Sequence, residues 1–134
     1  MEEAFLTPAP TRKSVVLVVE DEIPIRSMVS EYLRDVGFAV IEARNAGEAV
    51  AVLAASTPVD LVFTDVDMPG TMDGLMLAAW VQETHPAVPV ILASGVAELR
   101  DGHRGAGVLP KPYSPKVLER KIRELLGKTT RVAT

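Results

Sequence analysis

Carboxylates, a candidate nucleophile, a hydroxyl group and a cation follow four apolar stretches of this sequence, in that order along the chain. They are Glu20 and Asp21 after residues 15–19, Asp65 after 61–64, Ser94 after 90–93, and Lys111 after 107–110. Metal-assisted phosphorylation of a carboxylate needs these groups, because acids hold the cation while the other groups attack the phosphorus or neutralise the transferred oxygens. The four positions together indicate phosphoryl chemistry on an aspartate.

The apolar stretches explain how groups so far apart in the sequence can meet. A continuous apolar run is typical of a strand that is buried on both faces of a parallel sheet. In open α/β sheets, ligands bind just beyond the carboxyl ends of such strands. We therefore expect the four positions to converge on one crevice.

Strand and helix patterns alternate along the chain. Strands are predicted at residues 14–19, 38–43, 61–65, 90–93 and 108–109. Helices are predicted from Pro24 to Gly37, from Asn45 to Pro58, over 75–84, and from Ser114 to about 126. The glycine-rich stretch 95–107 leaves room for a fourth helix that is short or disordered. This alternation predicts an α/β fold with a doubly wound, five-stranded parallel sheet.

The length of 134 residues suits one domain with a single core. Residues 1–13 and 128–134 lack a periodic apolar pattern, so we expect a flexible leader and a flexible tail around a domain at 14–127. Lys128 marks the expected start of the tail.

Composition excludes several classes of protein. The net charge of -4 argues against a basic face that binds nucleic acid. No apolar stretch reaches the roughly 18 residues that a membrane span needs. The absence of cysteine excludes disulfides and thiolate metal sites, and without an export leader we expect a cytoplasmic location.

The acidic residues predict a metal site. Glu20, Asp21 and Asp65 would repel one another unless a cation lay among them. Mg²⁺ is the expected cofactor, bound by Asp21, Asp65 and the backbone carbonyl of Asp67, with Glu20 binding through a water molecule. An acidic pair after a strand is also compatible with a solvated loop or with a favourable charge at a helix N-terminus.

Asp65 is the predicted phosphoacceptor, since a carboxylate at a strand end can attack phosphorus to form an acyl phosphate. Ser94 and Lys111 are predicted to contact the transferred oxygens. Taken singly, the three residues are also compatible with a turn aspartate, a hydroxyl bonded to the backbone and a surface cation. Their order at successive strand ends favours a common role.

With these motifs in place, residues 14–126 resemble the receiver domain of two-component response regulators, of the chemotaxis-receiver type. Val-Glu20-Asp21-Glu resembles the acidic metal-binding pair, and Asp65 in Asp-Val-Asp-Met-Pro-Gly resembles the phosphoacceptor. Ser94 in Ala-Ser-Gly resembles the switch hydroxyl, and Lys111 in Lys-Pro-Tyr resembles the family lysine, whose bond to Pro112 is commonly cis. The resemblance implies a flavodoxin-like (βα)5 fold with strand order 2-1-3-4-5.

The resemblance also implies partners and a mode of action. A sensor histidine kinase or histidine phosphotransfer protein would supply the phosphoryl group from phosphohistidine. The receiver would catalyse its own phosphorylation and slow autodephosphorylation, as a signalling switch rather than a turnover enzyme. We expect a stand-alone receiver that acts through contacts with an unknown target protein, with neither nucleic acid nor a membrane as a partner.

Two alternative interpretations stay open. A phosphatase of the haloacid dehalogenase type also uses an Asp-x-Asp pair like Asp65 and Asp67. Such enzymes take further metal-binding acids after the lysine, where this chain has only Glu119 and Glu124 in an amphipathic helix. A constitutive receiver-fold interaction module is favoured by the short fourth helix and by Val108, which stands where the family usually has Phe or Tyr. The complete acidic site argues against it.

Overall fold

The computed structural model of the protein describes residues 12–95 and 106–133. Strands and helices alternate along them in the order β1 (Val15–Val19), α2 (Ile23–Asp35), β2 (Ala39–Ala43), α3 (Ala46–Ala54), β3 (Leu61–Asp65), α4 (Gly74–Thr84), β4 (Val90–Ser94), β5 (Ala106–Pro110) and α5 (Pro115–Ala133). The four strands expected to carry the candidate groups are thereby confirmed as β1, β3, β4 and β5. The short fourth helix predicted near 96–100 falls outside the described residues.

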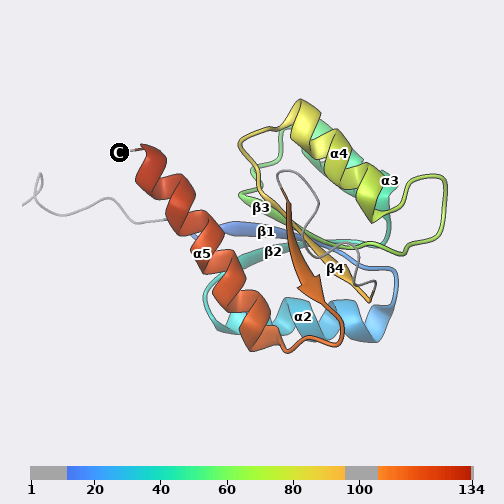
Figure 1. The fold of residues 1–134 in the computed structure, drawn as a ribbon, viewed down its shortest axis with the longest axis horizontal. Coiled ribbons are helices and arrows are strands. Elements are labelled where there is room, and N and C mark those ends of the chain that lie inside the picture. Colours follow the sequence, from blue (N-terminus) through green and yellow to red (C-terminus); the bar gives the residue numbers. More distant parts are fainter. Residues whose placement is uncertain (1–11, 96–105, 134) are drawn as a thin grey trace, which may run out of the picture.

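The five strands form one parallel sheet in the order β2-β1-β3-β4-β5, as expected (Figure 1). β1 and β3 are neighbours, and β4 and β5 follow them toward one edge of the sheet. The register pairs Asp65 with Ala93, and Ser94 with Pro110. Because all strands run in the same direction, their carboxyl ends meet at one edge of the sheet.

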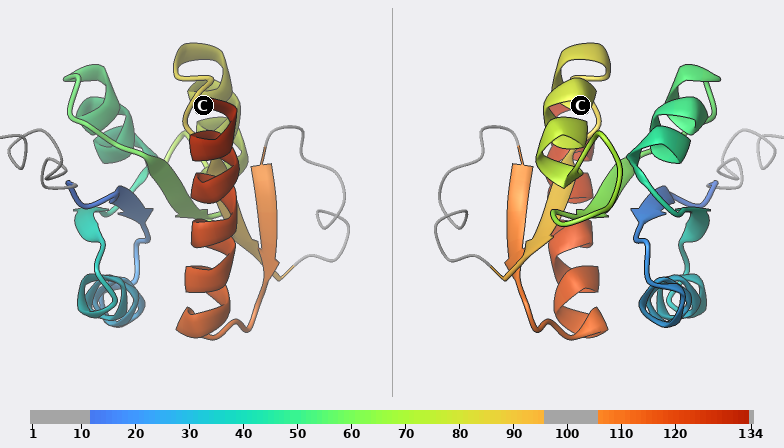
Figure 2. Two further views of the ribbon diagram at one scale, coloured as in Figure 1. Left: turned by 90° about the vertical axis from the view of Figure 1, so that its left-hand side faces the viewer. Right: turned by 90° about the vertical axis from the view of Figure 1, so that its right-hand side faces the viewer.

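Helices cover both faces of the sheet. Figure 1 shows α3 and α4 on one side and α2 and α5 on the other, and Figure 2 shows the same layers from two further directions. The side chains of each strand alternate between two apolar clusters, as the period of a strand requires. Leu17 and Val19 belong to the cluster beneath α3 and α4, whereas Val16 and Val18 belong to the cluster beneath α2 and α5. The doubly wound arrangement is therefore confirmed.

Side-chain caps begin three of the helices. Asn45 accepts a hydrogen bond from the Glu48 amide at 2.8 Å, and Asp73 accepts one from the Met76 amide at 2.9 Å. Ser114 Oγ accepts one from the Val117 amide at 3.2 Å. Each cap satisfies a backbone donor that the first turn of a helix leaves unpaired. The predicted caps Asn45 and Ser114 are confirmed.

α5 continues to Ala133, past Lys128, from which a flexible tail is predicted. Gly127 disfavours a helix by only about 1 kcal/mol, and no proline follows it. Extending an existing helix is much easier than starting one, so the chain stays helical beyond the expected boundary. In the leader predicted over 1–13, Arg12 forms an ion pair with Asp60 at 2.9 Å. No helix within the described residues is long and apolar enough to cross a membrane.

Ser30 of α2 places a hydroxyl group in the core. Its side chain is fully buried, and its Oγ has no hydrogen-bond partner among the described residues. We expect Ser30→Ala to raise the free energy of unfolding by about 1 kcal/mol, because the variant removes an unsatisfied buried polar group and improves helix propensity. Urea unfolding measures the change. Ser27→Ala, in the same helix but only half-buried, is the control for helix propensity. Equal gains in the two variants would contradict a desolvation cost at Ser30.

Candidate functional site

The β1–α2 turn positions two of the acidic residues. Glu20 continues the ladder beyond β1, since its amide donates to the Ala43 carbonyl at 3.0 Å. Its side chain is 5% exposed, and its Oε2 accepts a hydrogen bond from the Glu22 amide at 3.0 Å. The next residue, Asp21, is exposed. The turn therefore holds one carboxylate in the protein interior and the other at the surface.

Asp65 ends β3 beside this turn and is also 5% exposed. One carboxylate oxygen from each of Glu20, Asp21 and Asp65 lies within 4.8 Å of the other two. Burial raises the pKa of Glu20 to about 7, and the negative charges of Asp65 and Asp21 add to this rise, against the Glu22 hydrogen bond. The structure thus brings together the three carboxylates that the sequence analysis singled out.

Lys111 follows β5 and reaches the same place. Its Nζ lies 2.7 Å from Oδ1 of Asp65. Desolvation lowers the pKa of the Lys111 ammonium, but the hydrogen bond and attraction to Asp65 outweigh it, so the pKa is raised. The Lys111–Pro112 peptide bond is cis, as the resemblance implied. Lys111 therefore carries a firmly held positive charge at the phosphoacceptor candidate.

Ser94 lies between these two strand ends. It is the last residue of β4, it is 3% exposed, and its carbonyl accepts a hydrogen bond from the Lys111 amide at 2.8 Å. The preceding residue, Ala93, pairs with Asp65 in the sheet register. Val108, at the position where an aromatic residue is usual, pairs with Leu92 and is half-buried. Ser94 is thus held at the site by the same strand pairing that positions Asp65.

The residues present fit a magnesium ion. Their oxygens are the hard ligands that Mg²⁺ prefers, and one or two carboxylates with several retained waters are its usual protein partners. Burial is the main cause of the raised pKa of Glu20, and the charges of Asp65 and Asp21 add to it; a cation would offset these effects, because opposite charge favours the ionised carboxylate. Asp67 is held nearby, since its amide donates to Asp65 Oδ1 at 3.4 Å. The role of its carbonyl as a ligand stays a prediction.

The sequence analysis did not identify two residues of this site. Arg26 of α2 donates from Nη1 to the Glu20 carbonyl at 2.9 Å. Gly74 begins α4 so close to β3 that a Cβ there would overlap the Asp65 carbonyl oxygen. A signal existed only for Arg26: a cation in the first turn of a helix opposes the helix dipole and so points to a specific acceptor. Gly74 directly precedes the helix predicted over 75–84, and no pattern in the sequence reveals a close approach.

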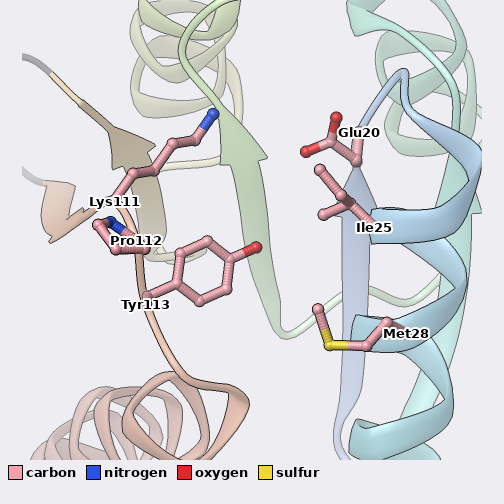
Figure 3. A pocket seen from close by; sticks show the side chains of 6 residues that line it. All are labelled: Glu20, Ile25, Met28, Lys111, Pro112 and Tyr113. Carbon is pink, nitrogen blue, oxygen red and sulfur yellow. The ribbon is translucent and has the colours of Figure 1, made fainter.

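A cavity of about 370 Å³ opens beside the acidic group. Figure 3 shows Glu20 at the end of β1, Ile25 and Met28 projecting from α2, and Lys111 and Tyr113 on the opposite wall. Tyr113 packs edge-on against Phe63 with ring centroids 5.6 Å apart. The polar groups of the site therefore border an apolar wall.

Tyr113 makes the fold sensitive to alkaline pH. Burial raises the pKa of Tyr113 from 10.0 to about 12, with smaller contributions from the charges of Glu20 and Asp65. Because the folded state holds the phenolic proton more tightly than the unfolded chain, this stabilisation is full below pH 10 and is lost as the pH rises toward 12. In metal-free protein, Tyr113→Phe is expected to lose less free energy of unfolding over that interval than the wild type. Urea unfolding at several pH values tests this, and parallel losses in both proteins would refute it.

Comparison with curated proteins agrees with this geometry. The family model for the response regulator receiver domain matches residues 16–123. The chain is 34% identical over 128 residues to a probable transcriptional regulator, ycf27, of Pyropia yezoensis, covering 92% of this chain and 51% of that protein. It is 38% identical over 121 residues to the sensor kinase CckA of Brucella abortus (strain 2308), covering 86% of this chain and 13% of that protein. The chain therefore spans about half the length of the first relative and much less of the second.

Solved structures show the same similarity. A response regulator receiver protein from Sinorhizobium medicae WSM419 has a TM-score of 0.80 at 26% identity, covering 87% of this chain and 97% of that one. The receiver domain of the hybrid histidine kinase CckA has a TM-score of 0.73 at 32% identity, covering 84% of this chain and 99% of that one. The family match, over residues 16–123, covers the strand ends that carry the acidic group, Ser94 and Lys111. The chain belongs to the response regulator receiver domain family.

Proposed function

We propose that Asp65 accepts a phosphoryl group from the phosphohistidine of a sensor histidine kinase or a histidine phosphotransfer protein, in a reaction that requires Mg²⁺. The observation that carries this proposal is the position of Lys111 Nζ, 2.7 Å from Asp65 Oδ1, in a group whose other carboxylates lie within 4.8 Å. A buried nucleophile flanked by a fixed cation and two further acids suits transfer of a highly charged group. Similarity to the receiver of a sensor kinase supports a donor of this class.

The phosphoryl transfer needs no reactant other than Asp65 and the phosphohistidine. A carboxylate oxygen of Asp65 forms a bond to phosphorus, the bond from phosphorus to the imidazole nitrogen breaks, and the electron pair stays on that nitrogen. Lys111 neutralises charge on the transferred oxygens, and the Ser94 hydroxyl donates a hydrogen bond to one of them. Bound Mg²⁺ would supply further charge neutralisation, held by Asp21, Asp65 and the Asp67 carbonyl, with Glu20 acting through water. Slow attack of water on the acyl phosphate then resets the switch.

The output of this switch is proposed to be a phosphorylation-dependent contact with another protein. A new charge and new hydrogen bonds at the strand ends bias a two-state element in the manner of other phosphorylation switches. The stand-alone form, with no nucleic acid as a partner, stays a prediction. The family match favours this function over a haloacid dehalogenase phosphatase.

Intact-mass measurement tests the proposed reaction. The protein is incubated with phosphoramidate and, separately, with acetyl phosphate, each with Mg²⁺ and with the ion chelated. We expect the mass of one phosphoryl group to appear with Mg²⁺ and to be absent with chelator. A third donor is a purified histidine kinase that has phosphorylated its own histidine. If neither this kinase nor either small donor phosphorylates the folded protein, the proposed phosphoacceptor function is wrong, and the constitutive interaction module replaces it.

A further inference from the structure

We propose that Arg26 is a positioning residue that sets the geometry of the metal-binding turn, an inference that rests on the proposed function of that site. Its guanidinium joins two elements: Nη1 donates to the Glu20 carbonyl oxygen at 2.9 Å, and Nε donates to Glu42 Oε1 at 3.2 Å. Arg26 lies on α2, Glu20 on the turn after β1, and Glu42 on β2. One side chain therefore ties the acidic turn to a helix and to a neighbouring strand.

The Glu20 carbonyl is a point where the turn needs such support. The sheet ladder still holds the Glu20 amide, which bonds to the Ala43 carbonyl at 3.0 Å, and the Glu22 amide holds its carboxylate at 3.0 Å. β1 ends at Val19 and the ladder reaches no further than the Glu20 amide, so no strand among the described residues bonds to the Glu20 carbonyl and fixes the plane of the peptide bond that links Glu20 to Asp21. The bond from Arg26 fixes that plane, and with it the direction in which Asp21 leaves the strand.

The placement of Arg26 is costly unless these bonds matter. Its side chain is only 12% exposed, and it is the fourth residue of α2, where the positive end of the helix dipole disfavours a cation. A guanidinium offers several donors in a rigid plane, so it can hold a carbonyl and a carboxylate at once. A lysine has a single nitrogen and cannot reproduce that bridge.

Positioning and simple electrostatics predict opposite effects on metal binding. A positive charge beside a cation site repels Mg²⁺, so if Arg26 acted through its charge alone, its removal would tighten binding. If Arg26 acts by holding the turn, its removal weakens binding, as loss of residues that orient metal ligands generally does. The sign of the change therefore separates the two roles.

Titration with Mn²⁺, followed by the EPR signal of the free ion and by competition with Mg²⁺, measures this change without any phosphorylation. We expect Arg26→Ala to weaken Mg²⁺ binding by about 10-fold. Arg26→Lys, which keeps the charge and the fold, is expected to weaken it in the same direction by less. In phosphorylation with phosphoramidate, Arg26→Ala is expected to need more Mg²⁺ for half-maximal rate while approaching the wild-type rate at saturating Mg²⁺.

Arg34→Ala is the matched control. Arg34 also donates to Glu42, at 3.2 Å, and to the Val40 carbonyl at 3.3 Å, but in the part of the chain that the structure describes it makes no bond to Glu20. Its removal is expected to leave Mg²⁺ affinity unchanged. Unchanged or tighter binding in both Arg26 variants, or equal weakening in Arg34→Ala, overturns the positioning role. Asp21→Asn tests the metal site itself. If the wild type binds no ion, or if Asp21→Asn does not weaken its binding, the proposed metal site is wrong, and Arg26 has no metal ligands to position.

Discussion

The Asp65→Asn variant is expected to gain no phosphoryl group under conditions in which the wild type is phosphorylated. The amide that replaces the carboxylate has the same shape but carries no charge, and its oxygen is far too weak a nucleophile to attack phosphorus. The variant also removes one of the three carboxylates that lie within 4.8 Å, and it deprives Lys111 Nζ of its ionic partner at 2.7 Å. Loss of the mass increase should be complete with both small donors.

Asp35→Asn is the control for this experiment. Asp35 is exposed at the end of α2, so its amide should leave phosphorylation unchanged. Circular dichroism and thermal unfolding establish that Asp65→Asn is folded. Phosphorylation of Asp65→Asn at the wild-type rate would move the acceptor to another residue and remove the basis of the proposed function.

The Gly74→Ala variant is expected to lose about 3 kcal/mol of its free energy of unfolding. A Cβ on Gly74 would overlap the Asp65 carbonyl oxygen and lie 2.7 Å from Cα of Val66. These are backbone atoms of the strand end that carries Asp65, so no side chain can rotate away. The bond from the Gly74 amide to the Val66 carbonyl, at 2.8 Å, would have to lengthen as α4 moves outward.

Gly127→Ala separates this steric effect from helix propensity. A Cβ on Gly127 meets nothing within 4 Å, and the residue lies within α5, so alanine there is expected to stabilise the protein by up to about 1 kcal/mol. Urea unfolding of both variants gives the comparison. If Gly74→Ala is as stable as the wild type, then α4 does not press on β3 and the close approach is wrong.

Much of the fold and the site follows from local patterns. Apolar runs predicted the strands, and the polar residues at the carboxyl ends of β1, β3, β4 and β5 predicted which residues lie at one edge of the sheet. In a parallel sheet, all strands end at the same edge. The residues that lie at this edge can therefore be identified from the sequence without knowing how the helices pack. The caps Asn45 and Ser114 were predictable for a similar reason, since a cap and its partner amide are three residues apart.

Contacts between segments far apart in the sequence could not be predicted from local patterns, and only the tertiary structure shows them. The burial that raises the pKa of Glu20 depends on neighbours from several elements, and the closeness of Gly74 to Asp65 depends on how α4 packs against β3. The bond from Arg26 to the Glu20 carbonyl joins the first turn of α2 to the turn after β1, so it depends on how α2 packs beside the end of that strand. The continuation of α5 past Gly127 was missed because propensity is a weak signal beside the ease of extending a formed helix. Residue types and their order thus specify the chemistry of the site, whereas distances, burial and support depend on packing that no local pattern encodes.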